Sequence, residues 1–346
     1  MNSDPEEYES LYNIAKTEIQ RLIKIYLRLV ENTNNLDNVT VKSLSSPETI
    51  VILLAGIGSN LDPRKADPIR AVKEWERRRA IPFDIETSVT TGVYFKLREI
   101  SEIYWDELTK ETKNFSKIDS EYIKNNPQYL PFLQHVCGIF SKSKLKEIVG
   151  SVNDVQISAP AAKRLAECIS ERVDPRNIRK GEILTRLGGT LEGIVRDLVG
   201  RILLESVVAN ALEAEGLPFE REEEYETLKG VVYDFRADFV LPNSKKPRVF
   251  IEVRKSSSRH ASLYAKDKMF SAINWKGENR DLLGVLVVDG QWTSATLNIM
   301  SKVFDYVIPI SGSPKLAKIL SAYISGDRSR LKWLIDFRIS ENPEAI

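Results

Sequence analysis

The chain has 346 residues, of which 42% are hydrophobic and 29% are charged, and its 50 Lys and Arg residues almost balance its 49 Asp and Glu residues. This length and composition are typical of a globular protein with one large domain or two of common size. The only histidines are His135 and His260, and the only cysteines are Cys137 and Cys168. A structural zinc site needs about four Cys or His ligands in close pairs, so these scattered residues exclude a zinc finger and a His-rich metal site.

The sequence also argues against membrane insertion and secretion. Its longest apolar runs, 51–57 and 282–288, are far shorter than the ~18 to 20 residues that span a bilayer. The acidic, polar start lacks the features of a secretory signal, and the cysteines carry no disulfide-framework spacing. We therefore expect a cytoplasmic protein without a membrane partner. The net charge of +1 predicts no strong overall attraction to nucleic acid, although such an average conceals local differences.

The N-terminal half is predicted to be mostly helical. Apolar residues recur every three or four positions over residues 8–31, the period of an amphipathic helix. A second helix is expected over 68–79, and residues 103–148 favour helix over strand. The apolar run 51–55 is strand-like. The two glycines that follow it indicate a turn rather than a dinucleotide-binding loop, because that motif needs a third glycine that opens a helix.

The C-terminal half alternates between helical and extended patterns. A helix is predicted from Ser158 to about Arg172, and another from an N-cap at Thr190 to Gly216. Strands are then expected at 219–225, 231–241, 248–255, 282–288 and 306–310, and helices at 262–275, 293–303 and within 313–339. Three consecutive strands indicate a meander, and later strands separated by helices indicate parallel additions to one mixed sheet.

Two carboxylates lie inside apolar strand patterns. Asp238 precedes an apolar run, and Glu252 lies between Ile251 and Val253. A carboxylate is costly to bury among apolar residues unless something pairs with it or coordinates it. Two strands joined by a tight turn bring these acids side by side, and a bound divalent cation relieves their repulsion. Hard oxygen ligands suit Mg²⁺, which leaves positions for water and phosphate.

A cation completes this pattern. Period-two alternation places Arg254 on the same strand face as Glu252, where it can neutralise charge on a phosphate. Asp234 competes with Asp238 because residues four apart share a strand face, and we prefer Asp238 because a core-like strand follows it. The alternative interpretation is a surface hairpin in which the acids pair with Arg236 or Arg254.

The segment resembles the PD-(D/E)XK nuclease superfamily, whose core is a helix, a three-stranded meander, and then a helix and further strands. The resemblance covers residues 190–310: Ala237-Asp238 stands where the family has Pro-Asp, and Glu252-Val253-Arg254 where it has Glu-X-Lys. It implies an α/β (α+β) fold, with a restriction-endonuclease-like core of a central mixed β-sheet flanked by helices. It also implies that the two acids are catalytic and bind Mg²⁺. The helix before the meander often supplies another acid in this family, and Glu192 is the matching candidate.

The arginine departs from the family pattern. A guanidinium stays protonated, so Arg254 can hold charge in the site but cannot act as a base. The lysine role then falls to Lys255, or to Lys266 or Lys268 on the following helix, as in relatives that relocate this residue. Alternatively, the metal and the substrate phosphate activate water alone.

Basic residues follow the second acid. Residues 248–280 contain eight Lys or Arg against three acids, and an acidic stretch at 213–229 offsets them in the total charge. Hydroxyls and cations of this kind contact phosphate oxygens, although a solvated surface is the alternative. The candidate DNA-binding residues in the two basic regions are Arg259, His260, Lys266 and Lys268, and Arg77, Arg78 and Arg79.

The chain's size and its added helical region look most like a type II restriction endonuclease. This implies a Mg²⁺-dependent, site-specific deoxyribonuclease that cuts double-stranded DNA as a homodimer. Residues 156–346 are then the catalytic domain, and residues 1–155 a mostly helical region for DNA recognition or dimerisation. The alternatives are a structure-specific DNA repair or recombination nuclease, and a DNA-binding protein with an inactive nuclease core.

Overall fold

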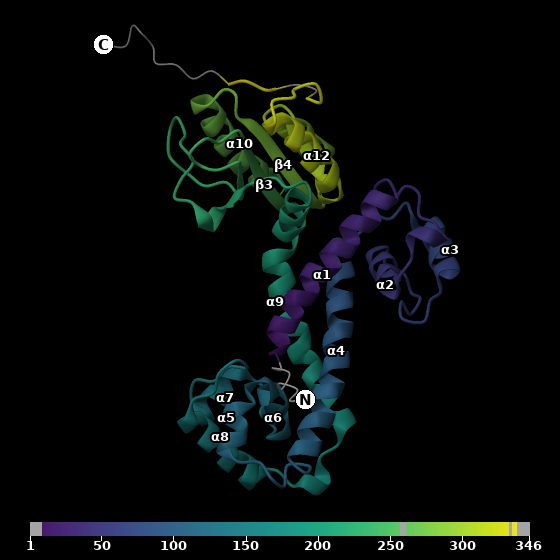
Figure 1. Cartoon of the computed structure of the whole chain (residues 1–346), viewed down its shortest axis with the longest axis vertical. Helices are drawn as coiled ribbons and strands as arrows, with labels where there is room; N and C mark the ends of the chain where they lie inside the picture. The colour runs from purple at the N-terminus through teal and green to yellow at the C-terminus, as the bar shows by residue number, and fades with distance from the viewer. Residues whose placement is uncertain (1–8, 257–260, 332–333, 338–346) are drawn as a thin grey trace, which may run out of the picture. The chain divides into compact units, whose positions relative to one another are not determined.

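The computed structural model describes residues 9–256, 261–331 and 334–337, and Figure 1 labels its main elements. The fold is α+β, with many helices and one five-stranded mixed sheet. The chain forms two compact units. Unit 1 is drawn from Met1–Leu22, Ile50–Ala66 and Arg78–Arg201, and unit 2 from Ile23–Thr49, Asp67–Arg77 and Ile202–Ile346. The bounds of these units differ from the expected division into 1–155 and 156–346. The roles expected for those two regions, DNA recognition or dimerisation and catalysis, stay predictions.

The helices before the sheet agree closely with the apolar periodicity. Residues Leu11, Ala15, Ile19 and Leu22 are buried at three- and four-residue spacing along the first of them, as an amphipathic helix requires. In chain order these helices are α1 (Leu11–Asn32), α2 (Pro47–Gly56), α3 (Pro68–Arg78), α4 (Ile85–Glu111), α5 (Ser120–Asn125), α6 (Leu130–Val136), α7 (Lys142–Val149), α8 (Ala159–Arg172) and α9 (Lys180–Ala214).

Two local predictions about the helical part of the chain are wrong. The run 51–55 lies in α2 rather than in a strand, because a short, uniformly apolar segment fits a buried helix as well as a buried strand. Thr190 is not an N-cap, since α9 begins at Lys180 and runs through Gly188 and Gly189. The leucines on either side of these glycines are buried, and this packing outweighs the poor helix propensity of glycine.

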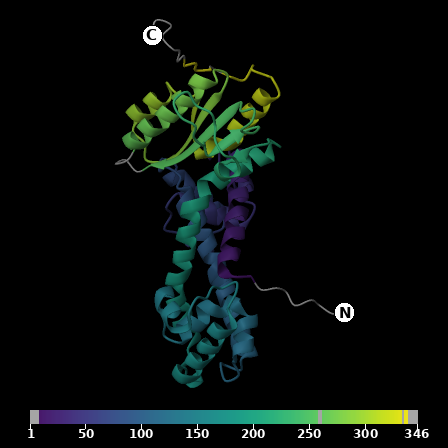
Figure 2. The ribbon, with the colours of Figure 1, turned by 90° about the vertical axis from the view of Figure 1, so that its left-hand side faces the viewer.

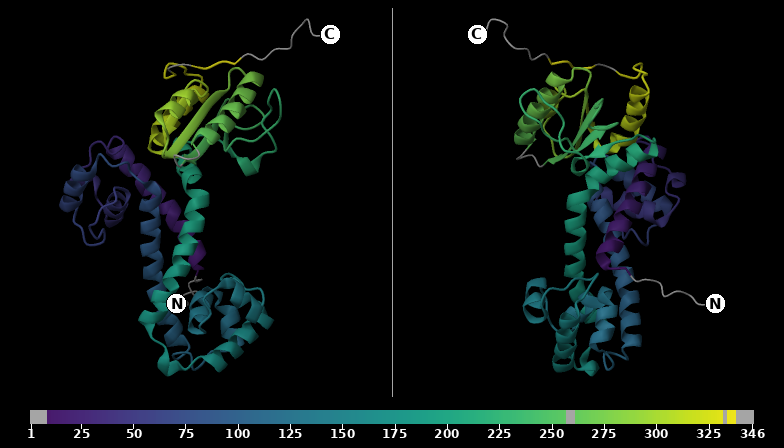
Figure 3. Two further views of the ribbon diagram at one scale, coloured as in Figure 1. Left: turned by 180° about the vertical axis from the view of Figure 1, so that it is seen from behind. Right: turned by 60° about the vertical axis from the view of Figure 1, so that its left-hand side comes forward.

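Unit 1 is built around long helices. Figure 3 shows α4 beside the first part of α9, where Arg98 donates a hydrogen bond to the carbonyl oxygen of Leu184 at 3.1 Å. A pocket of about 430 Å³ lies between these two helices and is lined by both polar and apolar side chains, among them Tyr94, Glu192 and Arg196. In the described part of the chain, every helix is too short or too polar to cross a bilayer.

The sheet of unit 2 has the predicted mixed topology. Its strands run in the order of the chain: β1 (Glu220–Arg221), β2 (Phe239–Leu241), β3 (Val249–Ser256), β4 (Leu283–Gly290) and β5 (Tyr306–Pro309). The first three strands are antiparallel neighbours, whereas β3, β4 and β5 are parallel. The expected strands 219–225 and 231–241 are much shorter than predicted, because a 3-10 helix at Glu222–Glu224 and irregular backbone replace most of them.

Helices cover both faces of this sheet. Helix α10 (Ala261–Glu278) lies against one face and α12 (Ser313–Ile324) against the other, while α11 (Ser294–Met300) joins β4 to β5 (Figures 1 and 2). The core under α10 is aromatic: the rings of Phe250 and Trp275 are 4.9 Å apart, and both are fully buried. Phe250 lies two positions before Glu252 on β3, so the alternation of a strand places Glu252 on this same α10 face.

Candidate functional site

Asp238 and Glu252 meet across the antiparallel pair of β2 and β3. Phe239 pairs with Ile251, so extending the register by one residue sets Asp238 opposite Glu252. Directly opposed residues of antiparallel strands project to the same face. Both carboxylates are inside the protein, with 6% of Asp238 and none of Glu252 exposed. The sequence prediction that these two acids come together is therefore confirmed.

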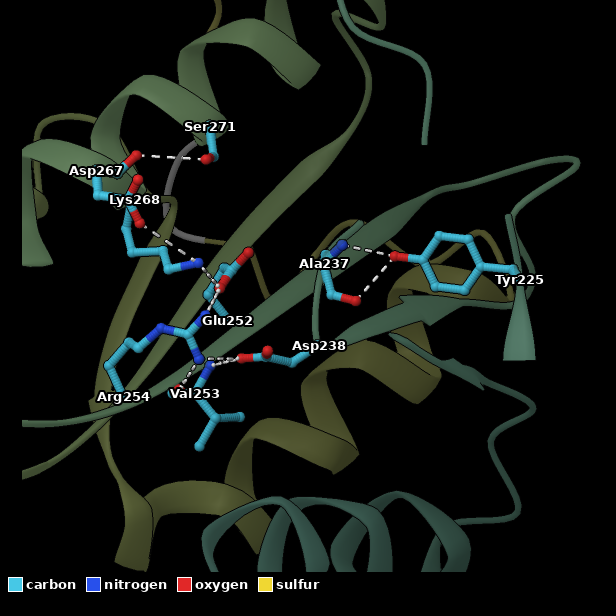
Figure 4. A network of polar contacts seen from close by, with 9 residues as sticks. All are labelled: Tyr225, Ala237, Asp238, Glu252, Val253, Arg254, Asp267, Lys268 and Ser271. Carbon is cyan, nitrogen blue, oxygen red and sulfur yellow. Dashed lines mark hydrogen bonds and ion pairs between the residues drawn. The ribbon is translucent and has the colours of Figure 1, made fainter. Parts of the chain in front are cut away.

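The carboxylate of Asp238 is held by two donors from β3. Its Oδ2 atom accepts hydrogen bonds from the backbone amide of Val253, at 2.6 Å, and from Nη1 of Arg254, at 2.9 Å (Figure 4). The backbone just before it is fixed as well, because the hydroxyl of Tyr225 bonds both the amide and the carbonyl of Ala237. Asp238 is thus fixed from both its side chain and its backbone.

Arg254 bridges the two acids. Its Nη1 contacts Asp238, and its Nη2 lies 3.0 Å from Oε2 of Glu252. With 28% of its side chain exposed, the guanidinium is the most accessible of the three groups. The pairing of an acid with Arg254 agrees with the surface-hairpin alternative, but the burial of both acids contradicts a surface location. Arg236, the other partner considered, instead contacts Glu222.

Lys268 reaches the same carboxylate from α10. Its Nζ atom lies 2.8 Å from Oε2 of Glu252, and only 7% of its side chain is exposed. Of the three lysines considered from the sequence, this is the one that the fold brings to the acids. Lys255 is paired more loosely, at 4.0 Å, with Asp289, and Lys266 is exposed on α10.

Glu252 is an incompletely satisfied buried acid. Although two cations flank Oε2, the Oε1 atom is buried and has no hydrogen-bond partner among the described residues. Burial, and then the nearby charge of Asp238, raise the pKa of Glu252 to about 7, while Lys268 and Arg254 act in the opposite direction. A carboxyl group with a pKa this far from its usual value, beside specific charge partners, is a functional-site candidate.

A third acid near the site was missed in the sequence. Burial, Asp238 and Glu223 together raise the pKa of Glu205, a half-buried residue of α9. Glu192, the acid predicted from α9, is thirteen residues earlier, which is more than three turns at about 3.6 residues each, and it belongs to unit 1. The missed signal was a glutamate inside the apolar run 202–208, the same signal that identified Asp238 and Glu252.

The described residues offer only a few ligands to a hard divalent cation. Asp238 and Glu252 offer oxygen ligands, and the orphaned Oε1 atom of Glu252 is a buried acceptor that a cation can satisfy. Within residues 9–256, 261–331 and 334–337, no three His, Cys, Asp or Glu side chains converge as a metal-binding group. Such a donor set suits Mg²⁺, which binds through one or two carboxylates and completes its shell with water and phosphate.

The predicted DNA contacts lie in separate places. Arg259 and His260 fall outside the described residues. Arg77 pairs with the buried Glu74, and Arg78 donates a hydrogen bond to the carbonyl of Gly58 at 2.6 Å. Arg79 is exposed at the end of the same basic segment. Of the candidates on α10, Lys268 points into the acidic site and Lys266 faces solvent.

Comparisons of the chain with protein families, with curated proteins and with solved structures find no significant match.

Proposed function

We propose that this chain is a Mg²⁺-dependent endonuclease that hydrolyses phosphodiester bonds in double-stranded DNA. The observation that carries the proposal is the convergence of Asp238, Glu252 and Lys268 on one point of the sheet. These residues come from β3, from α10 and from the residue just before β2, and all three are nearly or fully inaccessible to solvent. Burying two acids and a lysine together is costly for stability, and the raised pKa of Glu252 and the lack of a hydrogen-bond partner for its carboxylate among the described residues favour a function for this cluster.

The place of the cluster in the fold supports this proposal. A helix, three antiparallel strands, a helix and a parallel strand follow one another from α9 to β4, in the order of the PD-(D/E)XK core that the sequence resembles. Asp238 directly precedes β2 and Glu252 lies on β3, in agreement with the positions of the family's motif. Arg254 lies towards the carboxyl end of β3, the end of parallel strands at which open α/β sheets bind their ligands.

Each residue has a defined task in the proposed reaction. Asp238 and Glu252 hold Mg²⁺, which when bound supplies positive charge at the scissile phosphate and makes a water molecule more acidic. Lys268 holds an ammonium group against Glu252 and favours its ionised form. Arg254, the most exposed of the four, contacts the phosphate and stabilises the charge that develops on its oxygens. Glu205 adds negative charge beside Asp238 and strengthens the attraction for a cation.

The remaining parts of the proposal follow from the resemblance to type II restriction endonucleases. The enzyme cuts at a specific sequence and acts as a homodimer, because two symmetry-related sites cut both strands of a palindrome. The helical region outside the sheet unit reads the DNA sequence. A repair or recombination nuclease that reads DNA shape is the alternative with the same chemistry.

One observation favours a different class of protein. Arg254 bridges both acids, so its guanidinium already supplies the positive charge that a metal ion would bring. A permanently neutralised pair is compatible with a DNA-binding protein whose nuclease core is inactive. The orphaned Oε1 atom of Glu252 and the additional cation at Lys268 argue against it, since an inactive site has no need of an unsatisfied buried acid.

A cleavage assay tests these proposals. Purified full-length protein is incubated with supercoiled plasmid and with long linear duplex DNA, in Mg²⁺ and in EDTA. Discrete fragments in Mg²⁺ alone support a site-specific endonuclease, whereas a smear or cleavage only at branched structures supports the repair enzyme. Binding without cleavage supports the inactive core.

Two variants decide whether the cluster is the active site. We expect E252Q to lower the cleavage rate by ~10⁴-fold or more, equivalent to over ~5 kcal/mol of barrier. E278Q is the matched control, because Glu278 lies at the end of α10 and forms an exposed ion pair with Lys229. Full activity in E252Q, or equal loss in both variants, contradicts the assignment.

A further inference from the structure

Helix α10 is apolar on two opposite faces. Its inner face buries Ala265, Ala272 and Trp275 against the sheet. On its outer face, Leu263 and Phe270 are 62% and 50% exposed. These two residues are seven positions apart, which is about two helical turns, so they lie on the same side and about 10 Å apart along the axis. A helix that is apolar on both sides is typical of one that is covered on both sides.

The exposed side chains extend from α10 onto the neighbouring loop. The ring of Tyr233 stacks on that of Phe270, with 5.5 Å between centroids, and Val232 and Phe235 are exposed beside them. Asn274 of α10 fixes this loop, since it accepts a hydrogen bond from the amide of Val232 and donates one to the carbonyl of Tyr233. The result is an apolar cluster of Val232, Tyr233, Phe235 and Phe270 held to the helix, with Leu263 exposed about two turns before it on the same face.

This surface differs from the other exposed apolar residues that the structure describes. Ile69, Phe140 and Ile299, for example, are also exposed, but they come from three separate parts of the chain. Single apolar residues are normal on protein surfaces, whereas a contiguous patch marks an interaction site.

The charges on the outer face of α10 identify the partner. Lys266 and Asp267 lie at the midpoint between Leu263 and Phe270, and both are exposed. If a second α10 packs antiparallel on the first, Leu263 meets Phe270 of the second copy and Lys266 meets Asp267. Twofold symmetry repeats each contact, so along α10 these two apolar residues meet each other and these two charges meet their opposites. The patch carries no net charge from this pair, which disfavours DNA as its occupant.

We propose that the outer face of α10, together with Val232 and Phe235, is the surface through which two copies of this chain associate about a twofold axis. The inference identifies the interface of the homodimer that the proposed function expects, and in that respect it rests on that proposal. Its physical basis is separate, because self-association through α10 requires no catalytic activity. A mass measurement tests the interface, and DNA cleavage tests the chemistry.

The experiment measures the mass of the full-length protein by sedimentation velocity over a range of concentrations. We expect the wild type to be a dimer, and F270E to raise its dissociation constant by on the order of tenfold or more. The matched control is I299E, which places the same charge at an exposed apolar position on α11. Far-UV circular dichroism verifies that each variant is folded.

A charge exchange tests the antiparallel geometry. K266D and D267K each set two pairs of like charges across the axis, so each weakens association by on the order of tenfold or more. The double variant K266D/D267K restores opposite charges at both positions and recovers most of the loss. A wild type that is monomeric throughout, a dimer unaffected by F270E, or a double variant weaker than both single ones overturns the proposal. Recovery in the double variant supports pairing of Lys266 with Asp267 of a second copy, as the antiparallel geometry expects.

Discussion

Two buried ion pairs on one helix differ in how completely their polar atoms are satisfied. Lys268 and Lys276 both extend from α10 to an acid under the helix. At the second position, Lys276 donates to Asp305 at 2.5 Å and to the carbonyl of Leu282 at 3.1 Å, and Asp305 accepts from the amides of Gly284 and Ile335. Neither side chain of this pair is exposed.

The pair of Lys268 and Glu252 is less completely hydrogen-bonded. Two cations lie near Oε2 of Glu252, but neither of its carboxylate oxygens has a hydrogen-bond partner among the described residues. Burial alone therefore does not distinguish an ion pair that stabilises the fold from one that belongs to a functional site. The pair at Lys276 is bound to the backbone at the start of β4 and at Ile335 and serves stability. The pair at Lys268 retains an unused acceptor next to a partly exposed guanidinium.

The largest expected effect on stability comes from removing one partner of the fully hydrogen-bonded pair of Lys276 and Asp305. K276M and D305L each leave one uncompensated buried charge, so each lowers the free energy of unfolding by about 3–5 kcal/mol. The double variant K276M/D305L removes both charges and lies much closer to the wild type. Chemical denaturation measures all four proteins.

The control for this experiment is K318M. Lys318 pairs with Glu31 on the surface, with about half of each side chain exposed, and its loss changes stability little. If the double variant loses the sum of the two single effects, the two residues do not act as a pair and the comparison fails.

A smaller effect is expected in the pH dependence of stability at the incomplete site. The pKa of Glu252 is raised from 4.5 to about 7 in the folded protein, so the unfolded chain releases this proton at lower pH than the folded one. The folded state therefore loses stability as the pH rises from about 4.5 to 7, by roughly 3 kcal/mol. E252Q has no such proton. Without metal, the unfolding free energy of the wild type should therefore fall relative to that of E252Q as the pH rises through this interval, and parallel curves would contradict the assignment.

The smallest effect concerns Arg254. Its guanidinium competes with a metal ion for the two carboxylates, so R254A should bind Ca²⁺ more tightly by on the order of tenfold, or about 1.4 kcal/mol, in a calorimetric titration without DNA. R254K should fall between R254A and the wild type, because an ammonium does not span both acids as a planar guanidinium does. K255A is the control, since Lys255 pairs with Asp289. Unchanged or weaker Ca²⁺ binding in R254A shows that Arg254 does not compete with the metal.

Most of the sheet could be predicted from the sequence because its central strands are short apolar runs with clear ends. The two acids could be predicted for the same reason, since a charge inside an apolar strand has to be compensated. The choice among Lys255, Lys266 and Lys268 could not, because it depends on how α10 is rotated against β3. That rotation is set by the packing of Trp275 and its neighbours, which the local pattern does not contain.

The errors also have physical causes. Residues 231–241 are predicted to form one strand, but the backbone of Val232 and Tyr233 hydrogen-bonds to the side chain of Asn274 on α10 rather than to a neighbouring strand. Only Phe239–Leu241 therefore pairs with β3. Glu205 was missed because it is the one acid of the site on a helix, where an isolated charge usually faces solvent.

Helix α10 has little tolerance for a change in its length. Lys268 and Lys276 lie eight residues apart, and each is directed to a different acid under the helix. A single inserted residue between them turns everything that follows by about 100° and shifts it by about 1.5 Å, which removes Lys276 from Asp305 and Trp275 from the core. The number of residues between Lys268 and Lys276 is therefore constrained as tightly as the identity of either lysine.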